Sequence, residues 1–153
     1  MIRKNLKKEI GKHIEEISEA LCEIADKIFD YAEPGFEEHK SSALLCDWLQ
    51  QRGFNVERGI CGLDTAFRGS YEFGTNGPSI GLLCEYDALP IGHACGHHLQ
   101  GPVMLAVADA LKSHVFDRPF KLVVYGTPAE ETTGGKIDMI EAGCFRELDV
   151  AFS

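Results

Sequence analysis

The sequence predicts an α/β layered fold, in which helices flank a largely parallel central sheet. Two amphipathic helices come first, and strands and helices alternate after them. The stretches "SIGLLCEY" and "FKLVVYG" are short, continuous apolar runs, as in strands that are covered on both faces. Hydrophobic residues make up 44% of the 153 residues and charged residues 25%, which is the globular range.

The first helix is predicted from apolar residues that recur at steps of three and four. They are Ile10, Ile14, Ile17, Leu21, Ile24 and Ile28. This helix should end before Pro34 and Gly35, which do not continue a helix. A second helix is expected over residues 37–51, followed by Gly53 as its C-terminal cap. Its inward-facing residues are expected to be Ala43, Leu44, Leu45, Trp48 and Leu49.

The rest of the chain is predicted as alternating strands and helices. "TAFRGSY" has the pattern of an exposed strand, and "GTNGP" that of a turn before the first buried strand. A helix follows over "GPVMLAVADALKSH", with Pro102 in its first turn. After the second buried strand, "GKIDMIEAG" is expected to form a helix closed by Gly143, and "LDVAFS" begins one more strand.

Charge and composition exclude several classes of protein. The formal net charge of −9 argues against a nucleic-acid partner. No stretch approaches the roughly 18 apolar residues that a membrane span needs, and the polar N-terminal segment lacks a signal-peptide core. We therefore expect a cytoplasmic protein with reduced thiols and no membrane partner. The six cysteines are Cys22, Cys46, Cys61, Cys84, Cys95 and Cys144.

Two polar loops follow the two buried strands, and they hold most of the reactive side chains. In open α/β sheets, binding crevices lie beyond the carboxyl ends of the strands. The first loop carries Asp87, His93, Cys95, His97 and His98, and the second carries Glu130 and Glu131. If the two strands are neighbours, a thiolate, imidazoles and carboxylates converge. This donor set suits a transition metal such as zinc.

The residues by themselves leave other interpretations open. Cys95 could be a small buried hydrophobic residue, Asp87 a turn residue, and the Glu pair a solvated acidic turn. A nucleophilic Cys95 activated by an imidazole is a chemical rival. A closed structural zinc site is another, and its ligands would be Cys84, Cys95, His93 and His97.

Two long motifs resemble a known family. "EYDALPIGHACGHHLQG" and "GTPAEETTGGKIDMIEAG" look like the signature segments of the aminoacylase–carnosinase metallopeptidases, which have a zinc-peptidase-like fold. "AEPGFEE" also resembles that family's N-terminal pattern. The most similar branch contains β-alanyl-dipeptide peptidases and p-aminobenzoyl-glutamate hydrolases. The resemblance covers nearly the whole chain and implies a two-metal hydrolase, with zinc or manganese, that cleaves amide or peptide bonds in dipeptides or N-acyl amino acids.

The resemblance also implies a role for each matching residue. Cys95 would be a metal-bridging thiolate, and His97 and Glu131 would be metal ligands. Asp87 matches the carboxylate that orients a ligating imidazole, which raises the basicity of the ligand. Glu130 matches the general base, which takes a proton from the attacking water and could pass it to the leaving amine.

The sequence departs from the family in two ways. His98 stands where the family usually has Asp or Asn, and it could be a substitute orienting group, an added ligand or a plain loop residue. The family's chain is also much longer, with a downstream histidine, an inserted lid and dimerisation domain, and a final histidine ligand. We therefore interpret residues 1–153 as the truncated N-terminal half of a metallopeptidase catalytic domain, without the lid and dimerisation domain and the C-terminal half.

This truncation has two expected consequences. The chain alone should be a weak or inactive hydrolase, because Cys95, His97 and Glu131 could hold one metal but not two. Unfinished sheet edges would favour self-association into a homo-oligomer. A non-catalytic metal-binding or interaction fragment that retains the fold is the alternative function.

Overall fold

A computed structural model describes residues 5–114 and 117–153 of the chain. Residues 1–4 lie outside the described residues. They are the start of the polar N-terminal segment that is predicted to lack a signal-peptide core. The elements in chain order are α1 (Leu6–Tyr31), α2 (His39–Gln51), β1 (Asn55–Arg58), the 3₁₀ turn η1 (Ile60–Gly62), β2 (Phe67–Phe73), β3 (Ser79–Cys84), α3 (His97–His114), β4 (Phe120–Gly126), α4 (Gly135–Glu141) and β5 (Val150–Phe152).

The five strands form one sheet in the order β1-β2-β4-β3-β5. β3 pairs with β4 and with β5 in parallel, whereas β2 is antiparallel to both β4 and β1. Four strands therefore run in one direction and β2 runs against them. The predicted α/β class is confirmed, and the sheet is mixed, with a largely parallel half at β4, β3 and β5.

Two details of the sheet differ from the prediction. The segment expected as an exposed strand is β2, which lies inside the sheet between β1 and β4. Phe67 at its start is fully buried, so one end of β2 belongs to the core. β1 was not predicted, because its four residues "NVER" are mostly exposed and polar and carry no apolar alternation.

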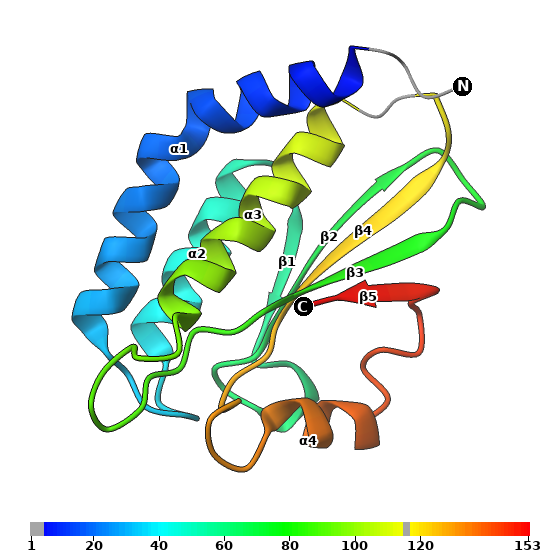
Figure 1. Cartoon of the computed structure of the whole chain (residues 1–153). Helices are drawn as coiled ribbons and strands as arrows, with labels where there is room; N and C mark the ends of the chain where they lie inside the picture. Colours follow the sequence, from blue (N-terminus) through cyan, green and yellow to red (C-terminus); the bar gives the residue numbers. More distant parts are fainter. Residues whose placement is uncertain (1–4, 115–116) are drawn as a thin grey trace.

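The helices cover both faces of the sheet. Figure 1 shows α1, α2 and α3 on one side, with α2 and α3 nearer the strands, and α4 close to the end of the sheet where β3 and β4 stop. Alternate residues of β4 belong to different clusters, as expected for a strand. Leu122 and Val124 pack into the larger cluster below the three helices, and Val123 and Tyr125 pack with Met139 of α4.

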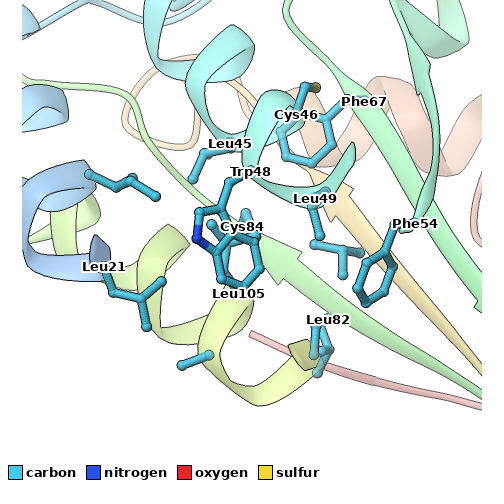
Figure 2. Packing of buried hydrophobic residues seen from close by; sticks show 14 of the residues in the cluster. Leu21, Leu45, Cys46, Trp48, Leu49, Phe54, Phe67, Leu82, Cys84 and Leu105 are labelled. Atoms are coloured by element: carbon cyan, nitrogen blue, oxygen red, sulfur yellow. The ribbon is translucent and has the colours of Figure 1, made fainter. Parts of the chain in front are cut away.

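The larger core joins α2 and α3 to the sheet. Leu45, Leu49 and Leu105 have no exposed surface, and Figure 2 shows them with Trp48 and Cys84 between the helices and the strands. Complete burial of such a side chain stabilises the fold by about 1.5–3 kcal/mol. The predicted first helix is confirmed as α1, and its periodic residues from position 17 onward are buried: Ile17, Leu21, Ile24 and Ile28.

Helix α3 begins earlier than the sequence predicted. It starts at His97 rather than at Gly101, so Pro102 lies in its second turn. The left-handed Gly96, with φ of 91°, precedes the helix, and the N–H of Leu99 bonds to the carbonyl of Gly96 at 2.9 Å. His97 and His98 are therefore helical residues and not loop residues.

The structure joins Cys61 and Cys144 in a disulfide bond, with their Cα atoms 6.7 Å apart. The prediction that all cysteines are reduced is therefore wrong for this pair. The two residues are 83 positions apart, and only the packing of α4 against the β1–β2 connection brings them together. Cys22 and Cys95 are exposed thiols, and Cys46 and Cys84 are buried thiols.

Within the described parts of the chain, none of the helices combines the length and the apolar character that crossing a membrane would require.

Candidate metal centre

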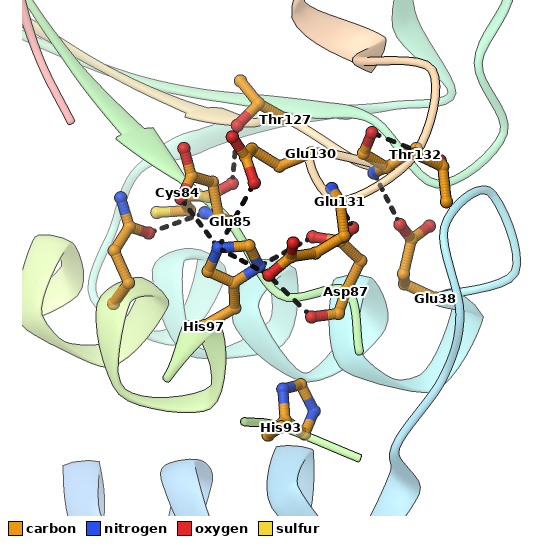
Figure 3. Close-up of polar contacts among 12 residues, drawn as sticks. Glu38, Cys84, Glu85, Asp87, His93, His97, Thr127, Glu130, Glu131 and Thr132 are labelled. Carbon is orange, nitrogen blue, oxygen red and sulfur yellow. Dashed lines mark hydrogen bonds and ion pairs between the residues drawn. The ribbon is translucent and has the colours of Figure 1, made fainter. Parts of the chain in front are cut away.

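The two polar loops meet where β3 and β4 end. The strands are parallel neighbours, and Cys84 pairs in register with Gly126, so the segments that leave them start side by side. Thr127 fixes this junction, because both its N–H and its hydroxyl donate to the carbonyl of Cys84, at 2.8 and 3.0 Å. Figure 3 shows the side chains that converge there. The neighbouring strands on which the metal interpretation depended are thus present.

His97 lies at the centre of the converging side chains and is only 8% exposed. Its Nδ1 lies 2.9 Å from Asp87 Oδ1. Its Nε2 faces the carboxylates of Glu85, Glu130 and Glu131, at 3.3, 3.6 and 3.7 Å. A neutral His97 would carry its proton on Nδ1, toward Asp87, and direct the lone pair of Nε2 at the three carboxylates.

Asp87 connects the two loops. It is 1% exposed; one oxygen faces His97, and the other accepts the N–H of Glu131 at 2.9 Å. Burial raises the pKa of Asp87, but the hydrogen bonds from His97 and from the Glu131 backbone outweigh burial and lower it. Asp87 is therefore an ionised carboxylate in the position expected of a group that orients the imidazole.

Glu85 belongs to the same cluster, and the sequence analysis missed it. Ligand atoms of Glu85, His97 and Glu130 all lie within 4.8 Å of one another. One oxygen of Glu85 also pairs with Nζ of Lys136, at the start of α4. Strand alternation could have identified it: Glu85 and Asp87 flank the fully buried Tyr86, so both turn to the same side.

Cys95 lies at the open side of the site, next to Glu131. Its thiol is exposed, and a hydrogen bond with the Glu131 carboxylate raises the pKa of Cys95. The thiol-enzyme interpretation needs an imidazole next to the thiol, whereas the partner of Cys95 is the Glu131 carboxylate. The structure thus gathers Asp87, Glu130 and Glu131 around His97, and it places Cys95 next to Glu131.

The other two histidines of the motif turn away from this cluster. Successive helical residues point about 100° apart, so His98 leaves α3 in a different direction from His97. The ring of His98 packs 5.1 Å from Phe29 and 5.3 Å from His93. His93 Nε2 in turn lies 3.0 Å from the carbonyl of Ile28 in α1. This geometry favours a helical packing residue, which is none of the three interpretations left open for His98.

The four residues of the closed zinc site do not gather around one point. Cys84 is fully buried in the larger core, where its thiol donates to the carbonyl of Gly101. His93 faces α1, and Cys95 is exposed beside Glu131. Of this set, His97 and Cys95 lie at the carboxylate cluster, and Cys84 and His93 do not.

The residues present fit a divalent cation. Four carboxylates surround His97, and Lys136 is the only Lys or Arg side chain paired with any of them in the described chain. The hydrogen bond with Asp87, helped by the neighbouring carboxylates, raises the pKa of His97, so positive charge is favoured at this point. Imidazole, carboxylate and thiolate donors together suit zinc, and imidazole with carboxylates also suits manganese.

Comparison with known proteins places these observations in a family context. No protein-family model matches the chain. It is 40% identical to the Xaa-Arg dipeptidase of Mus musculus over 96% of its own length, and 34% identical to a subunit of the p-aminobenzoyl-glutamate hydrolase of Escherichia coli over 95%. The chain spans only 37% and 35% of those two relatives.

Solved structures show the same fold. A dinuclear metal-binding peptidase of the M20 family from Bacillus subtilis matches 90% of the chain with a TM-score of 0.81 and 21% identity, and the match covers 43% of that structure. An aminobenzoyl-glutamate utilization protein from Klebsiella pneumoniae matches 94% of the chain with a TM-score of 0.79 and 16% identity, and 45% of that structure is covered.

Proposed function

Because the chain belongs to the aminoacylase–carnosinase family of metal-dependent peptidases and amidohydrolases, we propose that it contributes to hydrolysis of amide or peptide bonds in small substrates. Dipeptides and N-acyl amino acids are the substrate classes that its relatives' names support. The observation that carries the proposal is His97, held by Asp87 on one side and facing three carboxylates on the other.

We assign Cys95, His97 and Glu131 as metal ligands, for zinc or manganese. Three protein ligands with one open position are the usual composition of a catalytic zinc site. Asp87 fixes the tautomer of His97 and holds the Glu131 backbone, so it aligns two of the three ligands. A second metal, as in the complete enzyme, would need ligands beyond these three.

Glu130 is the proposed general base. Its side chain is 40% exposed, so it can reach a substrate while it stays 3.6 Å from His97 Nε2. When bound, a divalent metal supplies Lewis-acid chemistry and makes water a stronger nucleophile at neutral pH. Glu130 would take the proton of the attacking water and deliver it to the leaving amine.

Metal content and one substitution test this function. Purified chain should bind zinc or manganese stoichiometrically after reconstitution. Glu130→Gln should remove the hydrolysis that the wild type shows and leave metal content unchanged, whereas Glu141→Gln, on the exposed face of α4, should change neither. Loss of metal from the Glu130 variant would make Glu130 a ligand, and a wild type that takes up no metal would overturn the proposal.

We further propose that residues 1–153 are the N-terminal half of a catalytic domain and that this chain alone hydrolyses slowly or not at all. The share of the relatives that it spans, 35–38% for the first three, supports this view. The same observation favours the alternative of a non-catalytic metal-binding chain. Stoichiometric metal without any hydrolysis would support the alternative. Vigorous dipeptide hydrolysis by the chain would contradict both the slow hydrolysis proposed here and the non-catalytic alternative.

A cytoplasmic location is proposed as well, and cell fractionation tests it. The Cys61–Cys144 bond is the observation that opposes it, because cytosolic thiols generally stay reduced.

A further inference from the structure

Glu38, the residue before α2, is a completely buried carboxylate that the metal centre does not use. One of its oxygens accepts the N–H of Ala129 at 2.8 Å, and the other accepts the hydroxyl of Thr65 at 2.8 Å. Burial raises the pKa of Glu38, whereas these donors oppose the shift. Acidic side chains are almost never fully buried unless they are paired, so these contacts define the role of Glu38.

The partner of Glu38 is Ala129, at the turn where the second polar loop, which carries Glu130 and Glu131, begins. Ala129 is fully buried, has φ of 57° and comes directly before Glu130 and Glu131. The left-handed region is strained for a residue with a Cβ atom, and it persists only where the surroundings enforce it. The N–H of Ala129 donates to Glu38, and the Ala129 carbonyl accepts the N–H of Gly134 at 2.9 Å, which closes the loop.

The short segment before α2 contacts both loops of the site. The carbonyl of Glu33 accepts the N–H of Ala88, next to Asp87, at 2.8 Å. Gly35 packs directly on the second loop: a Cβ at Gly35 would lie 2.8 Å from the Cβ of Ala129. Figure 3 shows Glu38 beside this loop, with its dashed bond reaching the turn that carries Glu130 and Glu131.

We propose that Glu38 is a positioning residue, whose hydrogen bond to Ala129 sets the direction in which Glu130 and Glu131 leave their loop. The metal-related part of this statement rests on the proposed function, because it takes Glu131 as a ligand. The ordering of the loop does not, since it concerns only the bond between Glu38 and the Ala129 backbone.

The experiment compares four variants of the chain. Glu38→Ala removes the acceptor. Glu38→Gln retains one oxygen for Ala129, and its amide can donate to the Thr65 hydroxyl, so it should rescue the loop. Thr65→Val is the matched control, because it removes the other bond of the same carboxylate and spares Ala129. Gly35→Ala leaves Glu38 in place and displaces Ala129, the donor of its hydrogen bond, from the same side.

Hydrogen exchange of the metal-free chain is the first measurement. Glu38→Ala and Gly35→Ala should speed amide exchange in residues 129–134 by about tenfold or more and leave β3 and β4 unchanged. Glu38→Gln and Thr65→Val should stay within about twofold of the wild type in this loop. If Glu38→Ala is too unstable to purify, Gly35→Ala carries the same prediction. Unchanged exchange in the loop of either variant, or an equal increase in Thr65→Val, overturns the proposal.

Zinc affinity, measured by competition with a chromophoric chelator, is the second measurement. Glu38→Ala and Gly35→Ala should bind zinc about tenfold more weakly than the wild type, and Glu38→Gln should bind it normally. Unchanged zinc affinity in both weakened variants would overturn the metal-related part. A wild type that binds no zinc would instead refute the proposed function, while the exchange result would still decide whether Glu38 orders the loop.

Discussion

Asp87 orients the His97 ring from the Nδ1 side, opposite the Nε2 atom that faces the glutamate carboxylates. Asp87 contacts Nδ1 and, through its second oxygen, the backbone of Glu131, so one carboxylate positions two candidate ligands from different loops. His98, the next residue along the helix, packs its ring against Phe29 and His93 instead. At this scale the direction of a side chain, and not its type, separates a candidate ligand from a packing residue.

Asp87→Asn should weaken zinc binding by about 10–100-fold. The amide cannot accept from both His97 and the Glu131 N–H, because one of its two ends is a donor. Competition with a chelator at fixed pH measures the loss. Asp26→Asn, the same change at an exposed position of α1, is the control and should bind zinc as the wild type does. Equal affinities for the two variants would show that Asp87 does not orient the site.

A second polar network connects the elements on the α4 side of the sheet. Glu147 follows α4 and accepts two bonds from Arg68 of β2, at 2.6 and 2.9 Å. It also accepts from Lys121 and Tyr125 of β4, at 2.5 and 2.6 Å. The hydrogen bond from Arg68, followed by those from Lys121 and Tyr125, outweighs burial and lowers the pKa of Glu147 to about 2.

This network predicts how stability depends on pH. The pKa of Glu147 falls from an ordinary value of 4.5 to about 2 on folding, so its ionised form favours the folded state. The contribution is complete above about pH 4.5 and is lost as the pH falls toward about 2. Denaturant unfolding at several pH values should show wild type more stable than Glu147→Gln at pH 6, with a difference that shrinks below pH 4.5. A constant difference across this range would contradict the assignment.

The disulfide bond ties the β1–β2 connection to the segment after α4. Its residues are 83 positions apart, so reduction should lower the free energy of unfolding by about 2–4 kcal/mol, because a long loop gains freedom in the unfolded chain. Guanidinium unfolding with and without a phosphine reductant measures the change. A Cys61→Ser, Cys144→Ser double variant should already show the loss and should not respond to the reductant. A wild type that is indifferent to the reductant would mean that the bond does not form.

At the scale of the whole molecule, the sheet ends in an exposed edge. In the described chain β5 pairs only with β3, and its Val150 and Phe152 are 42% and 56% exposed. An apolar groove of about 350 Å³ lies next to it. The groove is lined by Ile80, Leu82, Val103, Met104, Val107, Leu111 and Phe152. A strand with one unpaired edge beside an apolar surface favours association with another chain.

We therefore expect the purified chain to self-associate through this edge. Phe152→Lys should lower the average mass seen by sedimentation velocity at a fixed protein concentration, because a charge at an edge strand opposes pairing. Ile137→Lys places the same charge at an exposed position of α4, outside the groove, and should sediment like the wild type. A wild type that is monomeric at high concentration would contradict the prediction.

Sequence periodicity predicted the elements that are long and buried, and it failed where an element is short or polar. α1 was predicted because its apolar residues recur at steps of three and four, and β3 and β4 because their apolar residues form continuous runs. β1 has only four residues and no such period. The start of α3 was placed too late because Pro102 suggested a first turn, whereas the helix begins at His97.

The candidate site was predictable in its residue types and not in its full membership. Asp87, Cys95, His97, Glu130 and Glu131 stand in two motifs that the sequence displays directly. Strand alternation places Glu85 on the same side as Asp87, but its pairing with Lys136 spans 51 positions, and Glu38 reaches Ala129 across 91 positions. No local pattern reports such contacts, because they depend on the path of the chain between the two residues.

The sequence by itself thus determined the α/β class, the two loops that carry the chemistry and the resemblance to a hydrolase family. These follow from the helical period of 3.6 residues, from continuous apolar runs and from residue types within single motifs. Only the tertiary structure decided that β3 and β4 are neighbours, that His97 and not His98 faces the carboxylates, and that Glu38 contacts the second polar loop. The physical reason is that strand order and helix rotation are fixed by packing between segments distant in sequence, which satisfies buried polar groups and fills the core together.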